Sequence, residues 1–450
     1  MQICASSLNH ALADPKVGVM NFLNEIAMRY PDAISFAPGR PREEYFDVAG
    51  SLDYVAAYAG YAAAGHDGSR QAAFGQLGQY GRTNGMIGAL IAQMLRNDDE
   101  VAVTADDIVV TVGCQEAMCL ALLALCGNPG DVALVADPAY IGLSGAARLF
   151  GIELASVASD DLGLRMDALE HTLERLRADG KTARLLYLSP DAANPTGATM
   201  SAAARARLLE LTRLHGIVVL EDHAYNYFQY DAEHRPLKSA PDTDHVIYLG
   251  SFSKSVYPGL RLGFLATTLQ VRCATGGSVH LAEEISKIKS MMTVNTSPLC
   301  QAIAGGLLLR HDCSLKGFTA GRRAQVRESR DAMLAALDRH FPAGQSWCAG
   351  VRWNAPSGGF FLCLGLPFIV TEADLLRSAR EFGVLWTPMS YFYLERAASD
   401  EIRLSFSYVT ATQAEAGVAA LARWVRARID TPAPQAAQAP QAHDVLEAPV

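Results

Sequence analysis

The chain has 450 residues, of which 50% are hydrophobic and 19% are charged, and its net charge at pH 7 is −9. This composition can supply a large buried core and excludes a disordered, collagen-like or coiled-coil chain. The acidic balance, without a long run of Lys and Arg, excludes nucleic acid as an expected partner, and the longest apolar run, residues 117–126, is too short for a membrane span.

The N-terminus and the cysteines indicate a cytoplasmic protein. The first cationic side chain is Lys16, so the basic start of a signal peptide is missing. The nine cysteines are an odd number and form no CxxC pair. We therefore expect reduced thiols and neither a disulfide framework nor a metal site.

In chain order, the hydrophobic pattern first predicts clear strands and helices beyond the Gly-rich stretch 60–88. Between residues 107 and 252, short apolar runs rich in β-branched residues alternate with helical segments, and each run ends in small or polar residues. Such runs are typical of strands buried on both faces, so we expect a mostly parallel sheet with helices on both sides. The predicted strands are 107–113, 131–138, 184–190, 216–222 and 246–252, and the clearest helices are 115–126 and 201–215.

The last third of the chain differs in pattern. A long Arg-rich helical stretch is followed by alternating strands near SGGFFLCL and EIRLSFSY, and then by a helix through Leu421 and Trp424. We predict a large domain over residues 61–316 and a smaller α+β domain over 317–430, on which residues 1–60 pack. Residues 431–450, rich in Pro, Ala and Gln, are predicted to be a disordered tail.

Ligands of open parallel sheets bind at the carboxyl ends of the strands, so the residues that follow each predicted strand are candidates for a site. They include a Gly-Cys-Gln turn before a helix, whose free N–H groups would suit a phosphate. In chain order the candidates are Gly113, Cys114, Gln115, Tyr140, Asn194, Asp222, Tyr225, Ser251, Ser253 and Lys254.

Lys254 follows an apolar strand and lies between serines, with Arg261 close behind. An arbitrary lysine is a surface residue, but a partly desolvated one can have its pKa lowered enough to react with a carbonyl group. Ser251, Ser253 and Arg261 could hold a phosphate nearby.

Asp222 ends a run too apolar to hold a free charge cheaply. It is either a loop or capping aspartate or the partner of a protonated pyridine nitrogen, as a pyridoxal phosphate (PLP) enzyme requires. Asn194 in NPTG could form only a turn, or it could bind the hydroxyl of such a ring together with Tyr225. Tyr140 could pack in the core or stack on the ring.

Arg403 lies on a predicted alternating strand, opposite Ile402 and Leu404. It is either an exposed strand arginine or a guanidinium aimed at a substrate α-carboxylate. Tyr80, by itself, is a loop aromatic residue.

Four segments, DPAY (137–140), NPTG (194–197), DHAY (222–225) and SFSKSVYPGLRLG (251–263), resemble in order and spacing the class I/II aminotransferases of PLP fold type I. The resemblance covers about residues 18–424. It implies an α/β fold with a mostly parallel sheet of the seven-stranded type in a large domain and a smaller α+β domain. It also implies PLP as cofactor, amino and 2-oxo acids as substrates, and a homodimer with shared active sites.

The resemblance also assigns roles to the candidate residues. Lys254 would bind the cofactor covalently, Asp222 would meet the ring nitrogen, Asn194 and Tyr225 the ring hydroxyl, and Tyr140 the ring face. Gly113, Cys114, Gln115, Ser251, Ser253 and Arg261 would surround the phosphate, which Tyr80 of the neighbouring subunit would also reach. Arg403, Asn194 and Gly39 would bind the substrate. Two departures from the family pattern are Leu90-Ile91 in place of the usual Leu-Arg and Cys114 in place of Ser or Ala.

A narrower resemblance concerns the substrate. Segments 21–41, 287–298, 357–362 and 386–393 resemble the 3,5-dihydroxyphenylglycine aminotransferases, which exchange an amino group between L-tyrosine and an arylglyoxylate. This implies an aromatic amino acid as substrate. Six aromatic residues either border the cleft or fill the core of the small domain: Phe360, Phe361, Trp386, Tyr391, Phe392 and Tyr393.

Other functions stay open on the sequence alone. The same scaffold serves decarboxylases, lyases and condensing enzymes, and an aminotransferase could use a non-aromatic substrate. A non-catalytic regulator with an aminotransferase-like domain would need a DNA-binding module, for which the chain has neither room nor a basic patch.

Overall fold

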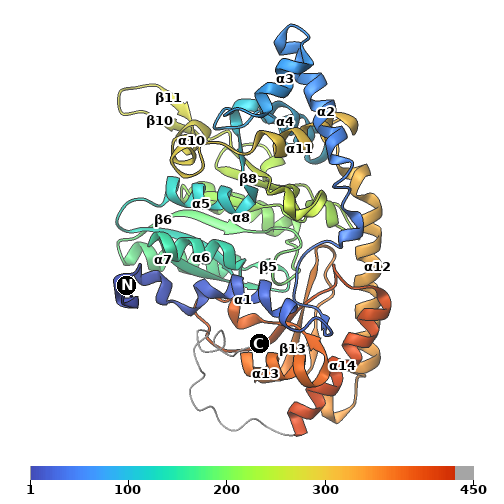
Figure 1. The fold of residues 1–450 in the computed structure, drawn as a ribbon. Coiled ribbons are helices and arrows are strands. Elements are labelled where there is room, and N and C mark those ends of the chain that lie inside the picture. The colour runs from blue at the N-terminus through green and yellow to red at the C-terminus, as the bar shows by residue number, and fades with distance from the viewer. Residues whose placement is uncertain (1, 431–450) are drawn as a thin grey trace.

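The structure is a computed structural model that describes residues 2–430 (Figure 1). The predicted tail, 431–450, lies outside the described residues. Within the described part, an eight-stranded sheet and a four-stranded sheet, each with helices packed against it, make up the two main units.

The larger sheet has the strand order β2-β9-β8-β7-β6-β3-β4-β5. Its five central strands, from β8 to β4, pair in parallel, whereas β9, β2 and the two-residue β5 pair antiparallel. The five predicted strands are confirmed. Strands β4 and β9 were not predicted; exposed residues interrupt the apolar pattern of β4, whereas β9 is fully buried. The bounds are β2 Ile108–Thr111, β3 Asp131–Asp137, β4 Glu153–Asp160, β5 Gly163–Leu164, β6 Thr182–Leu188, β7 Val218–Asp222, β8 Val246–Ser251 and β9 Gly263–Ala266.

Both faces of this sheet are covered by helices, as the continuous apolar runs predicted. Val132 and Leu134 of β3 pack with one set of helices, α7 and α8, and Ala133 and Val135 pack with the other set, α5, α6 and α10. Successive side chains of a strand point to opposite faces, so a strand covered on both sides must be apolar at every position. The helices are α5 Gly113–Leu125, α6 Ile141–Phe150, α7 Met166–Ala178, α8 Ala202–Leu214 and α10 Leu281–Met292.

The upper part of the larger unit in Figure 1 is helical. Helix α2 packs along α11, and Gly306 of α11 lies so close to Tyr54 that a Cβ would overlap its backbone. The Gly-rich stretch that the sequence left unassigned contains helix α3, which the Ser69 hydroxyl caps by accepting from the Ala72 N–H at 3.2 Å. The bounds are α2 Ser51–Ala62, α3 Arg70–Leu77, α4 Gly88–Asp99, α9 Phe252–Ser255 and α11 Pro298–Arg310.

The smaller unit is an antiparallel sheet in the order β12-β13-β16-β15, packed against the long helices α12 and α14. Two of its strands, β13 and β16, are the alternating segments that the sequence predicted. The bounds are α12 Lys316–His340, β12 Arg352–Trp353, β13 Phe361–Val370, α13 Glu372–Arg377, β15 Thr387–Pro388, β16 Ser399–Ser405 and α14 Ala411–Asp430.

The N-terminal segment touches both units. Strand β1 (Ile34–Ser35) pairs in parallel with β14 (Val384–Leu385) of the smaller unit. Helix α1 (Pro15–Arg29) lies against α6, and α2 lies against α11, both in the larger unit. The division of the chain at residues 60 and 316 stays a prediction.

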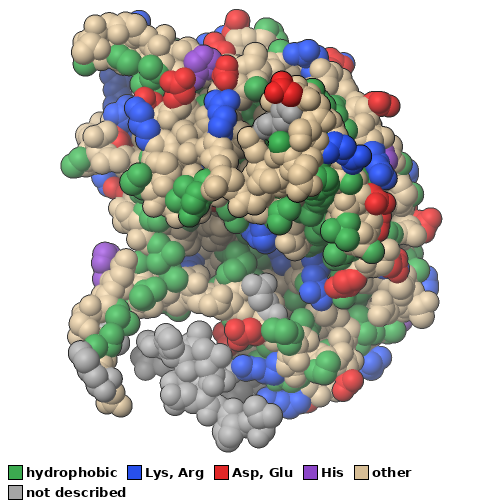
Figure 2. Space-filling view, turned by 45° about the horizontal axis from the view of Figure 1, so that its top comes forward, with side chains coloured by type: hydrophobic (Ala, Val, Ile, Leu, Met, Phe, Trp, Pro, Cys, Tyr) green, Lys and Arg blue, Asp and Glu red, His purple; other side chains and the backbone are tan. Residues whose placement is uncertain are grey.

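The surface carries mixed charge. Lys and Arg side chains are interspersed with Asp and Glu over the face shown in Figure 2, and no broad strip of one sign crosses it. A short hairpin of β10 (Gln270–Arg272) and β11 (Ser278–His280) projects from the larger unit in Figure 1. Within residues 2–430, no helix combines the length and the apolar character that crossing a membrane would need.

Candidate active site

The N-terminal turn of α5, directly after β2, forms an anion-binding cradle. The first N–H groups of a helix, here those of Gly113, Cys114 and Gln115, have no partner within the helix, and the N-cap residue, Val112, has no side chain that could accept from them. Gly113 has φ +73°, and a Cβ there would lie 2.7 Å from Arg261 Nη2. Glycine thus allows both the left-handed backbone and the approach of a guanidinium to the free N–H groups.

The end of β8 brings a second group of donors to this turn. Ser251 pairs with Gly263 of β9, where an added Cβ would lie only 2.6 Å from the Cys114 N atom. The Ser251 hydroxyl accepts from the Ser253 N–H at 3.2 Å and so begins the short helix α9, which carries Lys254. Ser251, Arg261 and the turn of α5 therefore lie together in one small region, which suits a phosphate, and Ser253 follows directly in α9.

Lys254 extends from α9 toward the N-terminal segment. Its Nζ donates to the Gly39 carbonyl oxygen at 2.8 Å, and it forms no ion pair in the described structure. Burial, followed by the positive charges of Arg261 and Arg403, lowers the pKa of Lys254 to about 8. A large share of neutral amine near pH 8 makes this lysine a nucleophile and a base.

Asp222 lies at the end of β7 and is 8% exposed. One carboxylate oxygen accepts from the Ala224 N–H at 3.1 Å, and the other accepts from the Tyr187 hydroxyl at 2.7 Å. The Cys114 thiol lies 4.0 Å from the first oxygen. Burial raises the pKa of Asp222 above its ordinary value, while the Tyr187 bond opposes that rise.

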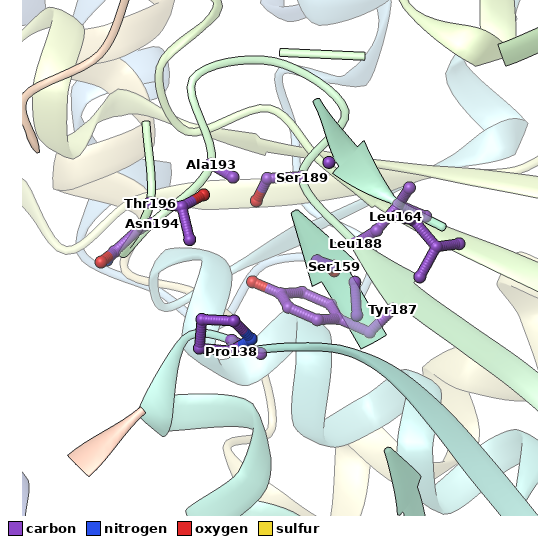
Figure 3. A pocket seen from close by; sticks show the side chains of 12 residues that line it. Pro138, Ser159, Leu164, Tyr187, Leu188, Ser189, Ala193, Asn194 and Thr196 are labelled. Atoms are coloured by element: carbon purple, nitrogen blue, oxygen red, sulfur yellow. The ribbon is translucent and has the colours of Figure 1, made fainter. Parts of the chain in front are cut away.

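Tyr187 was not among the residues predicted from the sequence. It projects from β6 into a small pocket whose lining includes Pro138, Asn194 and Thr196 (Figure 3). The available sequence signal was a tyrosine within a fully apolar run, since a buried tyrosine hydroxyl needs a hydrogen-bond partner.

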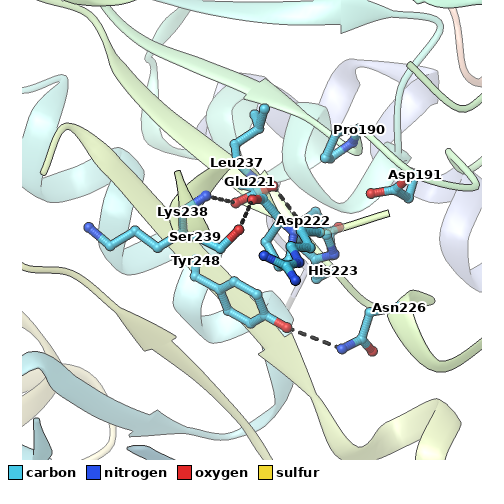
Figure 4. A network of polar contacts seen from close by, with 12 residues as sticks. Pro190, Asp191, Glu221, Asp222, His223, Asn226, Leu237, Lys238, Ser239 and Tyr248 are labelled. Carbon is cyan, nitrogen blue, oxygen red and sulfur yellow. Dashed lines mark hydrogen bonds and ion pairs between the residues drawn. The ribbon is translucent and has the colours of Figure 1, made fainter. Parts of the chain in front are cut away.

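A second buried network of hydrogen bonds lies around Glu221 and His223, at the end of β7 (Figure 4). His223 Nε2 lies 2.7 Å from a Glu221 oxygen, and its ring stacks on Tyr248 at 5.0 Å. Glu221 also accepts from the backbone N–H groups of Leu237 and Lys238. Burial alone would lower the pKa of His223, but the Glu221 carboxylate outweighs it and raises that pKa to about 9.

Arg403 on β16 is 5% exposed and faces the same region. Its Nη1 donates to Asn194 Oδ1 and its Nη2 to the Ala37 carbonyl oxygen, both at 2.8 Å. The guanidinium lies 4.1 Å from the centre of the Phe361 ring and 4.6 Å from that of Phe392. Burial lowers its pKa to about 10.

No carboxylate of the described residues pairs with Arg403, and its buried Nε has no hydrogen-bond partner there. A buried cation without a counter-ion is costly, so this position suits an anionic ligand. Gly39 borders it, because a Cβ at Gly39 would overlap the Phe361 ring.

Tyr140 and Tyr225 complete the group. Gly142 lies so close to both Tyr140 and Gln115 that a Cβ would overlap either side chain, and Gln115 donates to the Gly142 carbonyl oxygen at 2.7 Å. Tyr225 is 7% exposed and packs edge-on against Phe361 at 5.8 Å. Burial raises the pKa of both tyrosines, to about 12 for Tyr140.

Most of the predicted site residues thus meet at the carboxyl end of the larger sheet, where the smaller unit adds Arg403 and the N-terminal segment adds Gly39. Tyr80 does not join them: it is 80% exposed after α3 and makes no side-chain hydrogen bond in the described structure. Among residues 2–430, no cluster of His, Cys, Asp and Glu could hold a metal ion.

The six aromatic residues divide between the two expected roles. Phe361 and Phe392 flank Arg403. Trp386 is fully buried against Trp424, with ring centres 5.0 Å apart, and is a core residue. Phe360 is fully buried against Phe228, whereas the Tyr391 and Tyr393 hydroxyls bind Glu372 and Glu401.

Comparison with known proteins identifies the family. The family model described as "Aminotransferase class I and II" matches residues 58–421. The chain belongs to this family. It is a transaminase that depends on pyridoxal 5′-phosphate, and the site fits this group: free N–H donors and a guanidinium for a phosphate, a buried lysine, and a buried carboxylate.

Individual relatives agree with this assignment. The chain is 40% identical over 432 residues to an (S)-3,5-dihydroxyphenylglycine transaminase of Amycolatopsis orientalis, covering 96% of each chain. It is 31% identical to aromatic-amino-acid aminotransferase 1 of Thermococcus litoralis, over 77% of this chain and 80% of the relative. The structure of a Pyrococcus horikoshii kynurenine aminotransferase in complex with PMP superimposes with a TM-score of 0.79 at 26% identity, covering 94% of this chain and 98% of the other.

Proposed function

We propose that this aminotransferase moves an amino group between an aromatic amino acid, of the tyrosine or arylglycine type, and a 2-oxo acid. The observation that carries the proposal is the Arg403 guanidinium, buried between two aromatic rings and without an acidic partner in the described structure. Such a group can bind an α-carboxylate, and the rings beside it can pack against an aryl side chain. Two relatives named for arylglycine and aromatic substrates support the same class.

The absence of a second cation in this region argues against a dicarboxylic substrate. Arg403 can serve only one carboxylate, and the two cations that interact with it around the cofactor position, Lys254 and Arg261, are assigned to the cofactor. A side-chain carboxylate of aspartate or glutamate would then lie against Phe361 and Phe392 without a partner, which is unfavourable.

We assign cofactor roles to the residues that surround Lys254. The N–H groups of Gly113, Cys114 and Gln115, with Ser251, Ser253 and Arg261, would hold the phosphate. Asp222 would keep the ring nitrogen protonated, Asn194 and Tyr225 would bind the ring hydroxyl, and Tyr140 would cover the ring face. The bound cofactor supplies an electron sink for negative charge at the substrate Cα.

Lys254 would perform the proton transfer. Its amine would hold the cofactor covalently until a substrate amine replaces it, and the freed amine would then take the proton from the substrate Cα and deliver it to the cofactor carbon that receives the amino group. A pKa of about 8 suits both tasks near neutral pH, because the amine then accepts and donates a proton with little cost.

We further propose a homodimer in which Tyr80 reaches the phosphate site of the partner subunit. Tyr80 is 80% exposed, and Met291, which lies at 85% exposure near the end of α10, is another large apolar side chain that a subunit interface would cover. A cytoplasmic location is favoured by nine cysteines that are all free in the structure.

The test compares kcat/KM for tyrosine, phenylglycine, glutamate and aspartate with one keto-acid acceptor. We expect kcat/KM to be about tenfold higher for the two aromatic donors. The side-chain carboxylate of a dicarboxylic donor would lie in the site without a cationic partner, which costs roughly 1.4 kcal/mol or more. A tenfold preference for the dicarboxylic donors would reject the aromatic substrate. Conversion of one cofactor to its amine form for each donor molecule consumed would distinguish transamination from decarboxylation, elimination or condensation.

A further inference from the structure

Outside the site already described, the most deeply buried cation of the described chain is Lys289 on α10, with 0% of its side chain exposed. Its Nζ lies 2.9 and 3.1 Å from the two carboxylate oxygens of Glu116 and 2.9 Å from the Thr293 hydroxyl. Removing both charges from water costs much of what their attraction returns, so such a pair contributes little net stability compared with apolar residues. Its position in the molecule therefore needs another explanation.

Glu116 belongs to the first turn of α5, the helix whose N–H groups form the anion-binding cradle. One of its oxygens accepts from the Val112 N–H at 2.6 Å, and the other accepts from the Thr293 hydroxyl at 2.6 Å. Glu116 thus folds back to the residue just before the helix. It binds the backbone there and leaves the N–H groups of Gly113, Cys114 and Gln115 available for a ligand.

The charge of Glu116 would nevertheless oppose an anionic ligand at this turn. A carboxylate near a helix N-terminus is favourable for the helix itself, but it repels a phosphate placed a few ångströms away in a region of low dielectric. Lys289 brings the compensating positive charge from a different helix. The carboxylate can therefore fix the backbone without weakening the binding of a phosphate.

We propose that Glu116 and Lys289 are positioning residues for the phosphate-binding turn: Glu116 holds the backbone at Val112 in place, and Lys289 neutralises Glu116. The inference rests on the proposed phosphate site at Gly113–Gln115. Neither residue is among the groups that we assign to the cofactor; both act through the backbone and the charge of the turn.

The experiment measures affinity rather than turnover. Full-length enzyme freed of cofactor is titrated with pyridoxal phosphate and with pyridoxal, which lacks the phosphate, by the change in absorbance. The dissociation constant of pyridoxal divided by that of pyridoxal phosphate isolates what the phosphate contributes to binding. Lys289→Met should weaken the binding of pyridoxal phosphate by about tenfold or more and that of pyridoxal by less than about twofold. The reason is that only the phosphate is repelled by the Glu116 charge that Lys289 no longer neutralises.

A double variant and a matched control complete the design. Glu116→Gln combined with Lys289→Met removes both charges and should restore the ratio to within about threefold of the unaltered enzyme. Lys287→Met, on the same helix but with a 70% exposed side chain paired to Glu284, should leave the ratio unchanged.

Several outcomes would overturn the proposal. Equal weakening of both ligands by Lys289→Met, or a double variant no better than the single one, would mean that the pair serves only the fold. If Lys289→Met does not fold, Glu116→Gln carries the test: it keeps an acceptor for the Val112 N–H and should hold or raise the affinity ratio, and a fall would reject the proposal. A ratio near one in the unaltered enzyme would instead reject the proposed phosphate site.

Discussion

The Tyr187 hydroxyl donates a 2.7 Å hydrogen bond to the Asp222 carboxylate from the neighbouring parallel strand. The register pairs Tyr187 with Leu220, two residues before Asp222, so the tyrosine and the aspartate project from the same face of the sheet. Burial raises the pKa of Asp222, and donors to its oxygens keep the ionised form available. Tyr187 thus supports the charge on which we expect the protonated ring nitrogen to depend.

Tyr187→Phe should therefore lower kcat while changing KM for the amino acid by less than about twofold. Loss of one hydrogen bond to a charged group costs about 1.5–3 kcal/mol, which sets an upper limit of roughly 10- to 100-fold on the fall. Asp222→Ala should lose most of kcat. Steady-state kinetics checks both variants, with Tyr248→Phe as control because its hydroxyl binds Asp99 at 2.8 Å. Similar losses for Tyr187→Phe and Tyr248→Phe would indicate a general packing effect.

Lys254 should be the lysine that carries the cofactor. Borohydride reduction of the holoenzyme followed by peptide mapping should label Lys254, and Lys254→Ala should abolish turnover and labelling together. Lys238 provides an internal control, since burial lowers its pKa to about 8 as well, but its amine donates to the Thr243 carbonyl oxygen and the Thr268 hydroxyl. Label on Lys238 or Lys289 would contradict the assignment.

The lowered pKa of Lys254 predicts how cofactor capture depends on pH. Below about pH 8 the amine is mostly protonated and unreactive, so the capture rate should rise about tenfold per pH unit. Above about pH 8 the amine is mostly neutral and the rate should level off. Stopped-flow mixing of cofactor-free enzyme with pyridoxal phosphate between pH 6.5 and 10 measures this, and a rate still climbing at pH 9.5 would indicate an ordinary lysine with a pKa of about 10.4.

Arg403→Lys should mainly raise KM for the amino donor. The substitution keeps the charge but loses the planar fork and its two bonds, to Asn194 and Ala37, so we expect a rise of about 10- to 100-fold, and a larger one for Arg403→Ala. Arg352→Lys, at an exposed ion pair with Asp400 on the same sheet, should leave KM unchanged. An unchanged KM in Arg403→Lys and Arg403→Ala would mean that the carboxylate binds elsewhere.

Local sequence patterns were sufficient for much of the fold and for part of the site. The apolar runs of β3, β6, β7 and β8 are continuous because both sheet faces are covered, and that continuity is visible in the sequence without any knowledge of partners. The residues after these strands, including Asp222 and Lys254, could be grouped because parallel strands end at one edge of a sheet. Strand β4 was not predicted, because it is half exposed and therefore lacks a continuous apolar run.

The sequence by itself therefore determined the strands, the sheet edge and the residue types that meet there. Only the tertiary structure decided which distant groups pair: Arg403 with Asn194, Lys254 with the Gly39 carbonyl oxygen, and Lys289 with Glu116. It also separated Trp386, a core residue, from Phe392 beside Arg403, although both lie in one short aromatic segment. The physical reason is that periodicity records whether a side chain is buried, whereas its partner is set by how separate elements pack against each other.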